Sequence, residues 1–239
     1  IRRVISTGVQ SLAIQNENLN LQEVNYNLST IFGLINELDS LLTYRILVSE
    51  VLICLEKDHA PMPQKPAIFL YRDNTLIRDD GYIFEFEKFT WITGAVAALK
   101  RFHQAGLPVF IVTNQGGIGR GIFTESDMHK FNHHLIDAAK KAGGAITDIA
   151  FCPHHPLSPD SAMAAACRCR KPEPGLLFDL AQKWQIDLGT SVMIGDRNSD
   201  VEAGKRAGMA AYLFDRGDLD QLAKQVMDRH FMTKTDGKK

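Results

Sequence analysis

The chain has few cysteines, no excess of basic residues and no long apolar run. Lys and Arg number 27 against 28 Asp and Glu in 239 residues, which gives a net charge of −1. Without a basic excess, nucleic-acid binding is not expected. The longest apolar stretches, 46–55 and 107–112, are shorter than the roughly 20 residues of a membrane-spanning helix, so no membrane interaction is expected. The cysteines are not spaced like a secreted disulfide framework, and we expect a cytoplasmic protein.

Two different patterns lie on either side of a charged, proline-containing linker at 56–63. Before the linker, apolar residues recur every three or four positions from Leu21 to Leu42, the spacing of one helix face. We expect residues 1–60 to form a helical appendage, packed against a neighbouring helix or serving self-association or a fusion partner. Residues 61–230 are expected to form the main domain and 231–239 a flexible tail.

The main domain alternates short apolar segments with amphipathic ones. Strands are expected at 67–70, 109–113, 149–151, 192–194 and 211–214, and helices at 94–105, 124–142, 174–185 and 199–207. This order predicts an α/β, Rossmann-like fold, with a parallel sheet covered by helices on both faces. The alternating aromatic residues of 81–89 predict a small β-flap. Ligands of such sheets bind beyond the carboxyl ends of the strands.

Two pairs of metal-ligand residues bracket a twelve-residue loop: Cys152-Pro153-His154 and Cys167-Arg168-Cys169. Three thiolates and one imidazole complete a tetrahedral zinc shell and leave no open position. We therefore expect a structural Zn²⁺ held by Cys152, His154, Cys167 and Cys169, with unrelated buried thiols as the alternative. His155, the next residue, is expected at the surface or behind the ligands.

Polar residues follow the first two expected strands. Asp73 lies where a carboxylate could protonate a leaving oxygen and later activate water, although Asp is also common in turns. The second strand ends in Thr113 and Asn114, and a glycine-rich stretch leads on to Arg120. A hydroxyl, an amide and free backbone N–H groups can hold phosphate oxygens, and an ordinary strand-to-helix loop is the alternative.

Charged residues also precede the third helix and follow the fourth strand. Lys171 comes directly after the second cysteine pair and could place its charge on a phosphoryl group, or be exposed to solvent. Asp196 and Asp200 bracket the start of the fourth helix. One of them could bind Mg²⁺ while the other caps the helix, and a metal-free cap is the alternative.

Taken in order, these motifs resemble the haloacid dehalogenase (HAD) superfamily, and closely its D,D-heptose 1,7-bisphosphate phosphatases, with histidinol-phosphate phosphatase as a near relative. The likeness runs from about Pro66 to Leu222. It implies a HAD fold, a phosphatase acting on a sugar phosphate or bisphosphate, Zn²⁺ and Mg²⁺, and a place in carbohydrate metabolism and lipopolysaccharide synthesis. Matched to the family motifs are Asp73 (acid/base and Mg²⁺), Thr113 and Asn114 (phosphate), Lys171 (charge stabilisation), Arg170 (substrate) and Asp196 (Mg²⁺).

The chain departs from the family pattern at two positions. Tyr71 stands where the family has its nucleophilic aspartate, and Asn74 stands where it has a glycine. A phenol would form a far more inert phosphate ester than a carboxylate does. The neighbouring Asp79 and Asp80 lie too far past the strand to replace the nucleophile. We therefore expect a phosphatase-family protein with low or absent turnover. The alternatives are a non-catalytic phosphosugar-binding or scaffold module, a histidinol-phosphate phosphatase, or departures that are not native.

Overall fold

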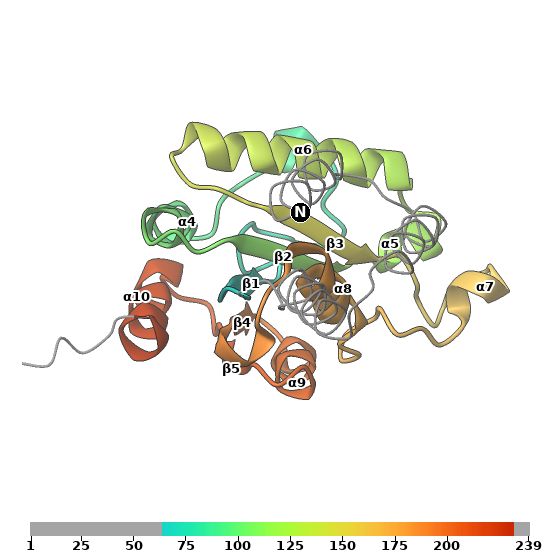
Figure 1. The fold of residues 1–239 in the computed structure, drawn as a ribbon. Helices are drawn as coiled ribbons and strands as arrows, with labels where there is room; N and C mark the ends of the chain where they lie inside the picture. The colour runs from blue at the N-terminus through green and yellow to red at the C-terminus, as the bar shows by residue number, and fades with distance from the viewer. Residues whose placement is uncertain (1–63, 232–239) are drawn as a thin grey trace, which may run out of the picture. The chain divides into compact units, whose positions relative to one another are not determined.

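The computed structural model describes residues 64–231, so the expectations for residues 1–60 and for the tail beyond residue 231 lie outside the described part of the chain. Within it, a five-stranded sheet is covered by helices on both faces (Figure 1). No described helix is long and apolar enough to cross a bilayer. The elements in chain order are β1 (Ile68–Leu70), η1 (Phe86–Lys88), α4 (Ala95–Gln104), β2 (Val109–Asn114), α5 (Gly116–Gly119), α6 (Glu125–Lys141), β3 (Asp148–Cys152), α7 (Ser161–Ala164), α8 (Gly175–Trp184), η2 (Leu188–Thr190), β4 (Val192–Gly195), α9 (Asn198–Arg206), β5 (Ala210–Leu213) and α10 (Leu219–His230).

The five strands are all parallel and lie in the order β3-β2-β1-β4-β5. Phe69 of β1 is level with Phe110 of β2 on one side and with Met193 of β4 on the other. The chain winds outward from β1 to β3 and then returns to the other side of β1. A ligand site is expected at this reversal, beyond the carboxyl ends of β1, β2 and β4.

Alternate residues of the central strands face two separate apolar cores. Ile68 and Leu70 pack in the core formed with α4, α6 and α10, whereas Ala67, Phe69 and Tyr71 pack in the core formed with α8 and α9. Successive side chains of a strand point to opposite faces, and a strand buried on both faces is therefore apolar throughout. Tyr71 continues this alternation past the end of β1, so its ring belongs to the α8 and α9 face.

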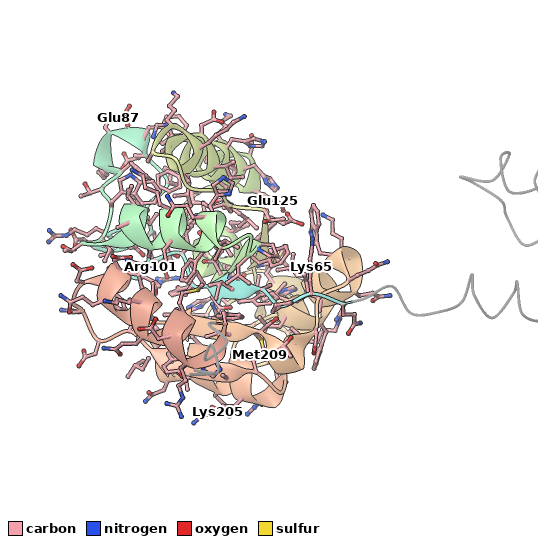
Figure 2. The ribbon with its side chains drawn as sticks, turned by 60° about the vertical axis from the view of Figure 1, so that its left-hand side comes forward. Lys65, Glu87, Arg101, Glu125, Lys205 and Met209 are labelled. Atoms are coloured by element: carbon pink, nitrogen blue, oxygen red, sulfur yellow. The ribbon has the colours of Figure 1, made fainter. Side chains whose placement is uncertain are left out.

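Helix ends are fixed by local capping and by a few ion pairs. The hydroxyl of Thr124 accepts from the backbone N–H of Asp127 at the start of α6, and the Asp127 carboxylate accepts from the Thr124 N–H. Arg101 of α4, labelled in Figure 2, donates to both carboxylate oxygens of Asp220 in α10 at 2.9 and 2.7 Å. The ion pair thereby joins α4 and α10, which are far apart in the sequence but lie on the same face of the sheet.

The predicted parallel α/β sheet is confirmed, and each predicted strand and helix is found within one or two residues of its expected ends. The prediction of a β-flap at 81–89 was wrong. That stretch holds only the 3-10 turn η1, and the nearby pairing consists of isolated bridges from Ile77 to Asp73 and Trp91. The aromatic side chains there pack on α6 and its neighbours, as in the stacked pair Phe86 and Phe131, so their alternation reflects packing rather than a strand ladder.

The helix α10 was not predicted. Its apolar residues Leu219, Ala223, Val226 and Met227 are buried at helical spacing, and the Asp218 carboxylate caps its first turn by accepting from the N–H of Asp220. This pattern was readable from the sequence.

We expect the two cores to depend on buried aromatic side chains. Phe102→Ala in α4 removes a fully buried ring and should lower the free energy of unfolding by about 3–5 kcal/mol, because a cavity remains. Phe178→Ala in α8, where the ring is 46% exposed, is the matched control and should cost less than about 1 kcal/mol. Urea unfolding of the three proteins checks this. Equal losses for the two variants would contradict the assignment of the core.

Candidate functional site

The expected polar residues meet beyond the carboxyl ends of three neighbouring strands. Tyr71 and Asp73 follow β1, Thr113 lies near the end of β2, and Asp196 follows β4. Lys171 reaches the same place from the segment before α8. The folding topology therefore brings together residues that are up to 125 positions apart in the sequence, at the reversal of strand order where α/β sheets bind ligands.

The carboxylate of Asp73 is buried and engaged on both oxygens. Its Oδ1 accepts from Arg72 Nε at 2.8 Å, and Arg72 Nη2 lies at the same distance. Its Oδ2 accepts from the Thr113 hydroxyl at 3.1 Å and from the Gln115 side-chain amide at 2.9 Å. Donors on both oxygens of a carboxylate fix its direction. Asp73 is thus held firmly where the acid/base residue was expected, and Thr113 is its hydrogen-bond donor.

Arg72 is a residue of the site that the sequence reasoning missed. Its side chain is 1% exposed and stacks on the Phe131 ring, with 5.2 Å between the guanidinium carbon and the ring centroid. Besides Asp73 it donates to Asn132 Oδ1 at 2.9 Å, to Gln115 Oε1 at 3.0 Å and to the Ile83 carbonyl at 3.3 Å. The only sequence signal was a charged residue directly after a buried strand, which is equally common at a solvent-facing turn.

Lys171 is buried and its ammonium is satisfied by the protein. The Nζ atom lies 2.9 Å from Asp200 Oδ1 and donates to the Val112 carbonyl at 2.5 Å. It also lies 3.8 Å from the centroid of the Tyr71 ring, within cation–π distance. Burial lowers the pKa of Lys171, and the Asp200 carboxylate opposes that shift. The lysine therefore reaches the site as expected, but its ammonium is paired with the Asp200 carboxylate and lies against the Tyr71 ring.

Tyr71, at the position where the nucleophile was expected, is a buried phenol. Its side chain is 6% exposed. Burial raises the pKa of Tyr71 well above its ordinary value, and the carboxylates of Asp73 and Asp200 raise it further. A phenolate therefore does not form near neutral pH, and the hydroxyl is a weak nucleophile.

Asp200 takes the helix-capping role that was expected of one member of this pair. Asp200 Oδ2 accepts from the Arg197 N–H at 3.0 Å, which confirms the predicted helix cap. Asp196 Oδ1 is buried and has no hydrogen-bond partner among the described residues. Burial raises the pKa of Asp196 to about 6, and the Asp200 carboxylate adds to the shift. An orphaned carboxylate oxygen at a strand end is a ligand suited to a hard cation such as Mg²⁺.

Asn114, Arg120 and Arg170 lie at the edge of the site. The Asn114 side chain accepts from the Lys171 N–H at 3.1 Å and donates to its carbonyl at 3.3 Å, so it positions Lys171. Arg120 donates to the Tyr82 hydroxyl at 2.7 Å. Arg170 donates to the His154 carbonyl at 2.6 Å. With His155 and the segment Ala164–Ala166, Arg170 lines a pocket of about 220 Å³ next to Lys171.

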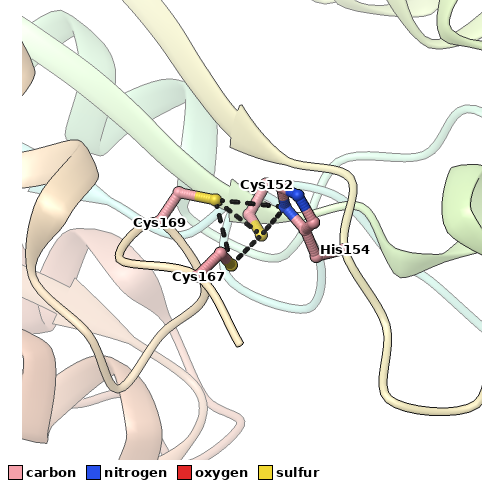
Figure 3. A group of neighbouring side chains, drawn as sticks. All are labelled: Cys152, His154, Cys167 and Cys169. Atoms are coloured by element: carbon pink, nitrogen blue, oxygen red, sulfur yellow. Dashed lines mark hydrogen bonds between the residues drawn. The ribbon is translucent and has the colours of Figure 1, made fainter. Parts of the chain in front are cut away.

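The predicted metal ligands converge in one group (Figure 3). The sulfur of Cys169 lies 3.1 Å from that of Cys152, 3.2 Å from that of Cys167 and 3.4 Å from His154 Nδ1. A disulfide would need about 2.05 Å between sulfurs, whereas four ligands around a zinc ion with Zn–S bonds of about 2.3 Å stand about 3.8 Å apart. The group is therefore arranged as a contracted tetrahedron, and its donor set fits a metal ion.

The thiols have an electrostatic reason to bind a cation. Burial raises the pKa of the Cys152 thiol far above its usual range, and its hydrogen bond to Cys169 adds to the shift. Three thiols crowded together cannot all ionise without a positive charge between them, and a metal ion supplies that charge. His155 lies beside the group rather than in it, and its Nδ1 accepts from the Leu157 N–H at 3.0 Å.

Comparison with known proteins relates the chain to HAD-like hydrolases. A model of HAD-hydrolase-like proteins matches residues 168–231. The D-glycero-beta-D-manno-heptose-1,7-bisphosphate 7-phosphatase of Rhodopseudomonas palustris is 41% identical over 168 residues, 70% of this chain and 93% of that protein. The alpha-anomer enzyme of Burkholderia mallei is 37% identical over 62% of this chain and 78% of its own length. The solved D,D-heptose 1,7-bisphosphate phosphatase of B. bronchiseptica, with magnesium and phosphate, superposes with a TM-score of 0.61 at 28% identity, over 68% of this chain and 98% of that one.

We expect the Cys/His group to hold one zinc ion per chain. Cys169→Ala removes the sulfur nearest to both other sulfurs and should lose the bound zinc and lower the melting temperature by several degrees, because the loop loses its cross-link. Cys54→Ala, at a cysteine that lies outside the described residues and is not one of the four predicted ligands, is the control. Elemental analysis of protein purified without added metal checks the stoichiometry. Zinc well below one equivalent in the unaltered protein would contradict the assignment.

We expect Asp196 to destabilise the metal-free protein at neutral pH. A carboxyl whose pKa is raised on folding, here from about 4 to about 6, holds its proton more tightly in the folded state. Stability therefore falls as pH rises through this window and stays lower above it. Asp196→Asn should be more stable at pH 7.5 by about 1–2 kcal/mol, since residual solvent contact screens the full effect of about 3 kcal/mol. The difference should vanish near pH 4. Urea unfolding in chelator at both pH values checks this, and a variant less stable at pH 7.5 would contradict it.

Proposed function

Because this chain belongs to the HAD-like hydrolases, in the D-glycero-D-manno-heptose 1,7-bisphosphate 7-phosphatase family, we propose that it binds a sugar phosphate but has lost hydrolysis at Tyr71. The observation that carries the proposal is the buried Tyr71 ring with the Lys171 ammonium 3.8 Å from its centroid. The residue that should attack phosphorus is replaced by an aromatic ring, and the charge that should stabilise the phosphoryl group lies against that ring.

Hydrolysis in the family needs an attacking carboxylate at the end of the first strand, and the residue at that position here is Tyr71. The phenol of Tyr71 stays protonated, as its raised pKa requires. Asp73 cannot substitute, since both of its oxygens accept from Arg72, Thr113 and Gln115. An ester formed on a phenol would also lack the ready hydrolysis of an acyl phosphate. The site therefore retains its acid/base residue but lacks the group on which that residue would act.

The number of anionic ligands available to Mg²⁺ is lower for the same reason. Asp196 offers a free oxygen, which suits the cation. Tyr71 offers a neutral hydroxyl in place of a carboxylate, and the Asp73 side chain is already engaged. Mg²⁺ neutralises phosphate charge when it is bound, and here we expect it to bind weakly. Asp196 is the residue that would hold it.

Arg170 and the pocket beside Lys171 support binding of a phosphosugar. The pocket, about 220 Å³, is lined by Arg170 and Lys171, by the metal-group residues His154 and Cys167, and by His155 and Ala164–Ala166; none of the described residues that line it is a carboxylate. The Arg170 guanidinium suits an anionic sugar derivative. The two relatives above act on different anomers, so the family likeness does not select between them.

A non-catalytic scaffold and a histidinol-phosphate phosphatase are the other candidates. Scaffold function would leave the pocket without a ligand, whereas the proposal requires saturable binding of the phosphosugar. A histidinol-phosphate phosphatase would favour the amino alcohol phosphate over the sugar bisphosphate. Competition between these two compounds in a binding assay separates the three candidates.

We expect Tyr71→Asp to restore phosphatase turnover in the presence of Mg²⁺. The variant supplies the attacking carboxylate and a second anionic ligand, so hydrolysis of heptose 1,7-bisphosphate should exceed that of the unaltered protein by at least about 10³-fold. Release of inorganic phosphate is the measurement. Calorimetry with Mg²⁺ should show tighter binding to the variant, because the site regains a negative charge.

Two further variants control this experiment. Tyr71→Phe removes the hydroxyl without adding a carboxylate and should stay inactive. Adding Asp73→Asn to Tyr71→Asp should abolish the restored turnover, because the acid/base group is lost. Turnover by the unaltered protein as fast as that of Tyr71→Asp would refute the loss of hydrolysis. A silent Tyr71→Asp that still binds the sugar phosphate would favour a binding module without a hidden catalytic site.

A further inference from the structure

Three side chains with metal-binding atoms follow one another along α6 at a spacing of four residues. They are Glu125, His129 and His133, and all three are exposed. Because residues four apart are neighbours on one face of a helix, these side chains form a single row, which we call the α6 row. Two histidines at positions i and i+4 are also the arrangement by which one helix supplies two ligands to a zinc ion.

His129 and Glu125 already stand at the separation of two ligands of one metal ion. The His129 Nε2 atom lies 3.3 Å from Glu125 Oε1. A charge-assisted hydrogen bond would be about 2.7–2.9 Å long. A nitrogen and an oxygen that bind one ion tetrahedrally at about 2.0–2.1 Å stand about 3.3 Å apart. The His129 ring also packs edge-on against Phe151, with 5.4 Å between the ring centroids, and this contact helps to orient it.

His133 has the tautomer that a metal ligand needs. Its Nδ1 lies 2.8 Å from the His129 carbonyl, and because a carbonyl only accepts, Nδ1 carries the proton and Nε2 holds the lone pair. Metal-binding histidines commonly donate their other ring N–H to such a carbonyl. Within residues 64–231, only the Cys/His group already has three or more ligand atoms within 4.8 Å of one another. The exposed His133 side chain therefore has to turn toward the other two, and such rotations are fast.

We propose that the α6 row binds a second Zn²⁺, separate from the ion expected at the Cys/His group. Two imidazoles and one carboxylate suit Zn²⁺ better than Mg²⁺, which takes oxygen ligands. Three protein ligands leave the fourth tetrahedral position to water. The α6 row binds more weakly than the Cys/His group, because its ligands are exposed and one of them must rotate.

A zinc ion on the α6 row would stabilise the part of α6 that supports the candidate site. An ion joined to both Glu125 and His133 clasps the first two turns of the helix. Asn132 lies in the same turns on their buried side, and its Oδ1 accepts from Arg72, which in turn donates to Asp73. Zinc bound at the surface would thus hold in place the helix segment that positions Arg72.

Calorimetry of the full chain with Zn²⁺ tests the second site. The unaltered protein should bind one more zinc ion than the double variant His129→Ala/His133→Ala, and this difference does not depend on how full the Cys/His group is. His103→Ala, at an exposed histidine of α4, is the matched control and should bind as the unaltered protein does. Equal zinc binding by the unaltered protein and the double variant would overturn the proposal.

Two further measurements examine the geometry and its consequence. Glu125→Gln keeps the size of the side chain but removes its charge, and it should weaken binding of the second zinc ion at least about tenfold. Excess Zn²⁺ should raise the melting temperature of the unaltered protein by a few degrees more than that of the double variant, because only the former binds the second ion. Unchanged affinity in Glu125→Gln would remove Glu125 from the ligand set. The same zinc-dependent rise in the unaltered protein and the double variant would refute stabilisation through the α6 row.

Discussion

The neutralisation of buried charge at the carboxyl ends of β1, β2 and β4 is the constraint on which the site depends. Arg72 and Lys171 are almost inaccessible to solvent, and each is paired with a carboxylate that is equally buried, Asp73 and Asp200. Removing one partner of such a pair costs about 3–5 kcal/mol, a large share of the about 5–15 kcal/mol that holds a domain folded. Folding alone is therefore sufficient reason for these residues to stay in place, whether or not the site turns over substrate.

This constraint also explains why a tyrosine fits at the nucleophile position. Its ring continues the row of Ala67 and Phe69 that faces α8 and α9, where a large apolar side chain adds to the core. An aspartate there would join Asp73, Asp196 and Asp200 around one lysine, and the excess negative charge would call for a divalent cation. Tyrosine adds no charge and offers its ring face to Lys171. A tyrosine at position 71 therefore makes the metal-free site easier to fold than an aspartate would.

The sequence predicted the architecture well because its signals were local. Apolar strands, helix periodicity and the spacing of Cys152, His154, Cys167 and Cys169 each follow from short-range chemistry, and the structure places them accordingly. The hydrogen-bond partners could not be predicted in the same way. Arg72 and Gln115 read as ordinary loop residues, and only the folded chain shows that both close on Asp73. The β-flap prediction was wrong for a related reason. Tyr82 and Phe84 pack on Phe123, and Phe86 packs on Phe131 of α6, and no local pattern reports such contacts.

The Cys/His group has a structural role that does not need catalysis. Cys152 ends β3 beside Asn114, and the Cys152 carbonyl accepts from the Gln115 N–H at 2.7 Å, so the group positions an amide that binds Asp73. On its other side Cys169 is followed after one residue by Lys171, whose backbone is held by the Asn114 side chain. A metal ion at this point would fix the β2 loop and Lys171 relative to each other. The same cross-link that orients a phosphatase site would also orient a site that only binds, so the proposed loss of hydrolysis does not require loss of the Cys/His group.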